Sequence, residues 1–261
     1  MELKLLAYEV KGKVGIITIN RPEVLNAIDE EAIVEMNALL DEIEKDKNIG
    51  CIIITGAGKK AFSAGGDIAH ELKQDSRGAY HFGRIGAQIT TRFERLRIPV
   101  IGAINGYALG GGLEFALCCD LRYAAETAKL GMPEIDLAVF PGWGGTQRLP
   151  RLIGEARAKE MIFSGKHITA QKAKEYGLVN DVYPAEELMD KCLEMADVLA
   201  AKAPLAMDSV KKAIYLGLQC DLERGLEIES ALFGPLYGTE DQHEAMTAFL
   251  EKRKPNPFKG R

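Results

Sequence analysis

Short apolar runs alternate with stretches of helical periodicity along the first part of the chain. Three of the runs are typical of buried strands: residues 14–19, 51–55 and 99–104. Between the first two runs, four apolar residues recur at helical spacing and predict a helix over residues 29–46: Ile33, Met36, Leu40 and Ile43. Strands that alternate with helices indicate an α/β fold, and the loosely recurring unit of strand, turn and helix indicates stacked turns.

The strand pattern ends before residue 204. Three helices are expected beyond this point, over residues 204–219, 221–236 and 239–252. They carry more apolar positions than they can bury among themselves, so we expect an oligomer interface there. The chain is therefore divided into a core of strands and helices, residues 1–200, and a helical oligomerisation region, residues 201–261.

The composition narrows the classes of partner. A length of 261 residues fits one main domain, and a net charge of −5 without a basic stripe argues against nucleic acid. The five cysteines and the four scattered histidines lack ligand spacing, so no metal is expected. No apolar run approaches the roughly 20 residues of a membrane span and no targeting pattern opens the chain, so we expect a cytoplasmic protein without a membrane partner.

The most informative stretch joins the apolar run 99–104 to three consecutive glycines. These glycines are expected to open a helix, where the first backbone N–H groups have no intrahelical partner and can donate to a developing negative charge. We expect the Gly111 N–H to be such a donor. Glu114 follows one turn later on the same face, inside an apolar run. Burying a carboxylate there is energetically unfavourable, which indicates that it has a function. The alternative is a glycine-rich turn followed by a surface glutamate.

A second glycine site, AFSAGGDI, follows the run 51–55. Its small residues permit close backbone approach, and we expect the Ala64 N–H to face that of Gly111 across one oxygen atom. An ordinary loop of small residues is the alternative. The stretch also fits a dinucleotide-binding pattern of glycines, but it does not continue as the helix that this pattern requires, so a nucleotide cofactor is disfavoured.

A second carboxylate, Glu134, follows Pro133. Proline is favoured at the first position of a helical turn, so Glu134 is expected near a helix start. Two carboxylates held near one water can act as base and acid, because like charges at close range separate their pKa values. This pairing favours chemistry that adds or removes water. Alternatively, Glu134 is a glutamate that merely complements a helix dipole.

Together these stretches resemble the enoyl-CoA hydratase, or crotonase, family. Four separated motifs carry the resemblance, in the family's order: NRPEVLNA (20–27), AFSAGGDI (61–68), INGYALGGGLE (104–114) and GMPEIDLAVFPGWGGTQRLPRLIG (131–154). The resemblance covers nearly the whole chain. It implies a crotonase-like spiral of ββα turns with a C-terminal helical trimerisation region, assembled as a homotrimer or a dimer of trimers. It also implies acyl-CoA thioester substrates, with coenzyme A as part of the substrate and no separate cofactor.

The resemblance implies roles for matching residues. Ala64 and Gly111 would form an oxyanion hole, Glu114 would activate water, and Glu134 would protonate C2 of the acyl group. The CoA moiety would be held by residues from two of the motifs and, from a neighbouring subunit, by two C-terminal residues: Val24, Ala27, Ala64, Gly66, Asp67, Ile68, Phe233 and Lys252.

The presence of both glutamates favours a hydratase, a lyase acting in either direction. Phe140 and Trp143 would shorten the acyl pocket, with ordinary core packing as the alternative. We therefore expect crotonyl-CoA or 3-hydroxybutyryl-CoA as substrate, in fatty acid and butanoate metabolism. Two other readings stay open: an isomerase of the same fold, which moves a double bond without adding water, and a non-catalytic relative that binds CoA or RNA.

Overall fold

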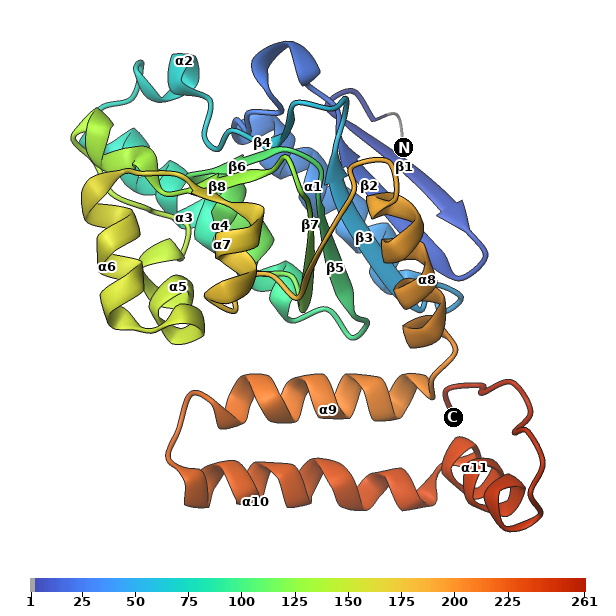
Figure 1. The fold of residues 1–261 in the computed structure, drawn as a ribbon. Helices are drawn as coiled ribbons and strands as arrows, with labels where there is room; N and C mark the ends of the chain where they lie inside the picture. Colours follow the sequence, from blue (N-terminus) through green and yellow to red (C-terminus); the bar gives the residue numbers. More distant parts are fainter. Residues whose placement is uncertain (1–2) are drawn as a thin grey trace.

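The computed structural model describes residues 3–261. The first three quarters of the chain, up to about residue 200, build two sheets covered by helices, and a separate helical region follows (Figure 1). The larger sheet has the strand order β1-β2-β3-β5-β7-β10. Its strands are β1 (Leu6–Lys11), β2 (Val14–Ile19), β3 (Cys51–Gly56), β5 (Val100–Ile104), β7 (Leu121–Ala125) and β10 (Asp181–Tyr183). The β1–β2 pair is antiparallel, and every other pair in this sheet is parallel.

A smaller sheet has the order β4-β6-β8-β9. Its strands are β4 (Ala61–Ser63), β6 (Tyr107–Leu109), β8 (Lys129–Gly131) and β9 (Ile168–Thr169). The strands β3, β5 and β7 of the larger sheet are followed along the chain by β4, β6 and β8 of the smaller one, and each such pair leads into helical turns. The predicted spiral of ββα turns is therefore confirmed.

Helices and helical turns complete the core. They are η1 (Pro22–Val24), α1 (Glu30–Lys45), α2 (Ile68–Glu71), α3 (Ser76–Glu94), α4 (Gly111–Leu117), η2 (Pro133–Leu137), α5 (Gly145–Ile153), α6 (Glu155–Ser164), α7 (Ala170–Glu175) and α8 (Leu188–Ala200). The apolar stripe predicted for residues 29–46 is buried on α1, and Asp29 caps this helix by accepting from the Ala32 N–H at 2.9 Å.

Strand β3 explains why continuous apolar runs appear in the sequence. All six of its residues are buried, because its neighbours in the parallel sheet are covered on both faces. Ile52 and Ile54 belong to the larger core cluster with α1, whereas Cys51 and Ile53 belong to a second cluster beneath α8. The alternation of side chains along one strand thus supplies both cores.

The C-terminal region consists of α9 (Pro204–Gly217), α10 (Leu222–Phe233), η3 (Gly234–Gly238) and α11 (Glu240–Leu250). Helices α9 and α10 pack side by side, apart from the sheets (Figure 1). Lys211 on α9 links this pair to the core, since its Nζ atom lies 2.6 Å from Asp120 Oδ2 and 3.0 Å from the Ile98 carbonyl oxygen. Across residues 3–261, no helix combines the length and apolarity needed to cross a bilayer.

Asn26 joins the loop after β2 to strand β4. It is fully buried and adopts a left-handed backbone conformation, with φ of 58°. Its Nδ2 donates to the carbonyl oxygens of Ala57 (3.0 Å) and Ala61 (2.8 Å), and its Oδ1 accepts from the Arg21 N–H at 3.0 Å. One side chain therefore holds together the two segments that carry the first two family-like motifs.

We expect Asn26→Ala to lower the free energy of unfolding by about 3 kcal/mol, because it leaves buried backbone groups without partners and places alanine at positive φ. Urea unfolding monitored by circular dichroism measures this loss. The control Asn48→Ala, at an exposed position, should stay within about 0.5 kcal/mol of the wild type. Equal stability of the two variants would contradict the role given to Asn26.

Candidate active site

The helix α4 begins with glycines because its N-terminus is crowded. Gly110 has φ of +53°, and a Cβ atom on Gly111 would lie 2.5 Å from Cζ3 of Trp143. A Cβ atom on Gly112 would lie 2.1 Å from the Ser63 carbonyl oxygen. The glycines therefore allow backbone and ring to meet at the point where the Gly111 N–H, at the first helical position, lacks an intrahelical partner.

Glu114 lies one turn into α4, as predicted, and is 2% exposed. Its Oε1 atom accepts from two backbone N–H groups, Trp143 at 2.8 Å and Gly145 at 2.6 Å. Burial raises the pKa of Glu114 to about 7, although these two hydrogen bonds and the positive charge of Arg148 oppose the rise. The alternative of a surface glutamate is thereby wrong.

Glu134 is held at the second position of the 3₁₀ turn η2, directly after Pro133. Its carboxylate lies over the start of α4, because a Cβ atom on Gly110 would be 3.2 Å from Glu134 Oε1. Within residues 3–261, neither of its two buried side-chain oxygen atoms has a hydrogen-bond partner. Burial, reinforced by the negative charges of Glu114 and Glu71, raises its pKa to about 7.

The two carboxyl groups thus converge on the N-terminus of α4 from different turns of the spiral. Because both have a pKa of about 7 and their charges repel, the pair can hold one proton between them near neutral pH. One group can then accept a proton while the other donates one. The unpaired oxygens of Glu134 indicate a group arranged for a ligand or water.

The structure corrects the prediction for Ala64. Its backbone N–H donates to the Leu25 carbonyl oxygen at 2.9 Å, so this group is engaged within the fold and cannot face Gly111 as a donor. The sequence pattern located the correct loop but not the direction of each N–H group. Hydrogen bonding between the loop and the segment around Ile28 decides that direction.

Gly66 is the residue of this loop whose N–H is turned away from the segment around Ile28. Gly66 pairs with Ile28 in a parallel bridge: the Ile28 N–H donates to Gly65 O at 2.8 Å, and the Asp67 N–H donates to Ile28 O at 2.9 Å. In such a bridge the residue in register directs its own N–H away from its partner. The adjacent Gly65 abuts α4, since a Cβ atom there would lie 2.9 Å from Gly111 N.

Two of the residues predicted to hold the CoA moiety, Ala27 and Asp67, contact the side chain of Arg21. This arginine donates to the Ala27 carbonyl oxygen at 2.7 Å and forms ion pairs with Asp67 and Asp29, both at 3.0 Å. Val24 ends η1, and Ile68 begins α2 with 57% of its surface exposed. Arg21 was missed as an organising residue, although it lies within the motif NRPEVLNA.

The two aromatic residues predicted for the acyl pocket differ in their exposure. Trp143 is 4% exposed and meets Phe82 and Phe115 edge to face, with ring centroids 5.2 and 6.0 Å apart. Phe140 is instead 68% exposed, because the segment after η2 runs along the surface before α5 begins. Core packing, the alternative for this pair, therefore holds for Trp143, whose ring also contacts Gly111.

Two further predicted residues lie away from the glutamates of their own chain. Phe233 ends α10 and Lys252 follows α11, and both are exposed. Figure 1 shows these helices separated from α4. A contact of either residue with a ligand at α4 therefore requires another copy of the chain.

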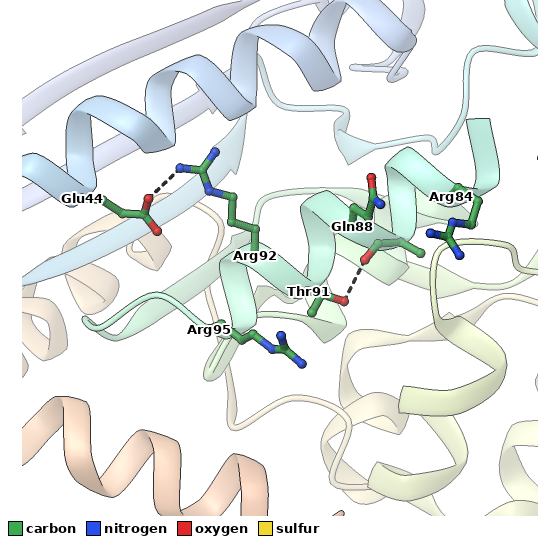
Figure 2. A pocket seen from close by; sticks show the side chains of 7 residues that line it. Glu44, Arg84, Gln88, Thr91, Arg92 and Arg95 are labelled. Carbon is green, nitrogen blue, oxygen red and sulfur yellow. Dashed lines mark hydrogen bonds and ion pairs between the residues drawn. The ribbon is translucent and has the colours of Figure 1, made fainter. Parts of the chain in front are cut away.

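A cavity of about 550 Å³ lies elsewhere, along α3 (Figure 2). It is lined by Glu44, Arg84, Ala87, Gln88, Thr91, Arg92 and Arg95. Arg92 closes one side through an ion pair with Glu44 at 2.6 Å. None of the predicted site residues lines this cavity. Among residues 3–261, no group of three or more His, Cys, Asp or Glu side chains is placed to hold a metal ion.

The raised pKa of Glu134 predicts a pH-dependent stability. Because folding raises this pKa from 4.5 to about 7, the folded state favours the protonated form, and the free energy of unfolding falls as pH rises through this window. Glu134→Gln cannot lose that proton. The difference in free energy of unfolding between the variant and wild type should therefore shift by about 2 kcal/mol in favour of the variant from about pH 5 to about pH 8.

Urea unfolding at the two pH values measures this gain. Glu186→Gln, which removes an exposed carboxylate, should follow the wild type at both. A constant difference between Glu134→Gln and wild type across the window would show that Glu134 is not held in an environment that disfavours its charge.

Comparison with known proteins relates this geometry to a family. The family model described as enoyl-CoA hydratase/isomerase matches residues 9–261. A short-chain-enoyl-CoA hydratase from Clostridium acetobutylicum is 46% identical, with complete coverage of both chains. A crotonyl-CoA hydratase from Syntrophomonas wolfei is 42% identical, with 95% of each chain covered.

The fold comparison agrees. The crystal structure of an enoyl-CoA hydratase from Bacillus anthracis superposes with a TM-score of 0.95 and 42% identity, covering 99% of this chain and all of the other. The match of sequence and fold extends over nearly the whole length. The chain belongs to the enoyl-CoA hydratase/isomerase family.

Proposed function

We propose that this protein is an enoyl-CoA hydratase, a hydro-lyase that reversibly adds water, in syn fashion, to short-chain trans-2-enoyl-CoA thioesters. The observation that carries the proposal is the pair of buried carboxyl groups, Glu114 and Glu134, each with a pKa of about 7 at the N-terminus of α4. Hydratases for short-chain enoyl-CoA and crotonyl-CoA among its relatives support the reaction and the substrate class.

Two backbone N–H groups would bind the thioester oxygen. Gly111 supplies one, at the first position of α4, and Gly66 supplies the other in place of Ala64. As charge moves onto that oxygen in the transition state, each preorganised donor can contribute about 3 kcal/mol. Because neither glycine has a side chain, the thioester can approach both N–H groups.

The two glutamates would divide the proton transfers. Glu114 is oriented by the two N–H groups on Oε1, so Oε2 can take a proton from water while the water oxygen bonds to C3. The electrons of the C2–C3 double bond shift toward the thioester, and Glu134 supplies a proton to C2. In reverse, the same groups dehydrate 3-hydroxybutyryl-CoA to crotonyl-CoA.

The CoA moiety would lie along the Arg21-centred region, as part of the substrate rather than a resident cofactor. Val24, Ala27, Gly66, Asp67 and Ile68 border this region. Ala64 can contribute its carbonyl group, and Phe233 and Lys252 would come from a neighbouring subunit. Trp143, packed on Gly111, would bound the acyl end and favour short chains. We further propose a cytoplasmic place in fatty acid and butanoate metabolism.

The test is loss of the conjugated thioester absorbance of crotonyl-CoA. We expect rapid loss with wild type, and a kcat lower by about 10² to 10⁴ in Glu114→Gln and in Glu134→Gln, because each variant removes one acid–base group. The control Glu186→Gln should keep wild-type activity. If wild type is active and either glutamine variant remains equally active, the two-glutamate mechanism is wrong.

We also propose that the chain assembles as a homotrimer or a dimer of trimers. Support comes from α9 and α10, which bury no residue within the chain. These helices and the turn between them expose apolar side chains: Leu205, Val210, Ile214, Leu216, Leu218, Leu222, Leu226 and Phe233. An apolar surface of this extent is typical of a protein–protein interface. Phe233 and Lys252 would then reach the substrate of a neighbour.

Sedimentation equilibrium tests the assembly. We expect a mass of three or six copies of the 28.5 kDa chain. Leu226→Glu should shift the population toward smaller species, because a charge would be buried in the interface. A wild-type monomer at micromolar concentration would contradict the proposal.

A further inference from the structure

A third carboxyl group lies beside the two glutamates. Glu71 is the last residue of α2 and folds back over Gly66. Its Oε1 atom lies 1.9 Å from the position that a Cβ atom on Gly66 would take, and the Phe82 ring lies 3.6 Å from that position. The carboxyl group therefore occupies the space that a side chain on Gly66 would fill.

Contacts on both sides hold α2 in place. Asp67 caps the helix by accepting from the N–H groups of Ala69 (3.0 Å) and His70 (3.3 Å), while Arg21 pairs with the same aspartate. The His70 ring packs against Phe82 in a tilted arrangement, with centroids 5.0 Å apart. Glu71 thus lies on a helical turn that is held in place by Asp67 and His70.

The environment of Glu71 is that of a group facing the site. It is half-buried, and within residues 3–261 its carboxyl group takes part in no hydrogen bond or ion pair with another side chain or backbone group. Burial raises its pKa, while His70 lowers and Asp67 raises it. Its negative charge in turn raises the pKa of both Glu114 and Glu134, so the three carboxyl groups lie within range of one another's charge.

The ring contacts place Glu71 toward the acyl end of the site. Phe82 contacts the Gly66 position beside the Glu71 carboxyl group, and the same ring meets Trp143 edge to face. Trp143 covers Gly111, the other backbone donor. Glu71 therefore lies on the side of the two donors where Phe82 and Trp143 pack.

We propose that Glu71 is a specificity-determining residue that restricts the enzyme to short, uncharged acyl groups and rejects thioesters whose acyl chain ends in a carboxylate. This inference rests on the proposed hydratase function. The carboxylate at the end of such an acyl chain would be repelled by Glu71, because the two groups would meet in a poorly solvated space. A longer apolar chain would cover the Glu71 carboxyl group and remove it from water without supplying a hydrogen bond.

The test compares kcat/KM for crotonyl-CoA, trans-2-hexenoyl-CoA and trans-glutaconyl-CoA, the last of which carries a terminal carboxylate. Wild type should prefer crotonyl-CoA over glutaconyl-CoA by about 100-fold or more, since the penalty is a buried like-charge contact. Glu71→Gln keeps the shape and should narrow this preference at least about tenfold. Glu71→Met should also raise the hexenoyl-to-crotonyl ratio by about tenfold.

Two further measurements separate specificity from a general defect. Glu31→Gln, at an exposed position on α1, should leave every ratio unchanged. Calorimetric binding of the unreactive thioesters butyryl-CoA and glutaryl-CoA should show the same discrimination, and Glu71→Gln should improve glutaryl-CoA binding selectively.

If wild type hydrates crotonyl-CoA but both Glu71 variants keep the wild-type ratios in turnover and in binding, the inference is wrong and the hydratase function stands. If wild type binds these thioesters without hydrating crotonyl-CoA, the proposed function fails instead.

Discussion

The structure of the site depends on one buried carboxylate and the two backbone N–H groups that bind it. Glu114 is removed from water on α4, and an unpartnered carboxylate there would be strongly destabilising. The N–H groups of Trp143 and Gly145 meet this requirement, but only because Gly145 has no side chain: a Cβ atom there would lie 2.9 Å from Glu114 Oε1. The loop before α5 is therefore fixed over α4, and the same burial raises the pKa of Glu114 toward neutrality.

This fixed loop also positions Trp143, which connects the remaining parts of the site. Its ring fills the space over Gly111 and Gly86, where a Cβ atom would lie within 2.5 and 2.2 Å of ring atoms. Phe82 packs on its edge and contacts α2, so helices α2, α3 and α4 are joined through two rings. Backbone donors and carboxyl groups from three turns of the spiral thus keep fixed relative positions, which is what differential stabilisation of a transition state requires.

The sequence predicted the features that depend on local patterns. Continuous apolar runs identified parallel strands buried on both faces, and the spacing of Glu114 and Glu134 relative to glycine and proline located both carboxyl groups correctly. Features that depend on tertiary contacts were missed. Ala64 and Gly66 differ only in which way each N–H points, a choice made by pairing with a distant segment. Phe140 was expected to shorten the acyl pocket together with Trp143, but local sequence does not show that its loop runs along the surface.

In the proposed mechanism, two buried carboxyl groups add water across a double bond next to a thioester. The most direct measurement is incubation of the enzyme with crotonyl-CoA in ¹⁸O-labelled water, followed by mass spectrometry of the acyl-CoA product. We predict 3-hydroxybutyryl-CoA with the heavy oxygen on C3, formed by wild type and not by Glu114→Gln. A product whose double bond has moved while no solvent oxygen has entered would contradict it and identify the chain as an isomerase of the same fold.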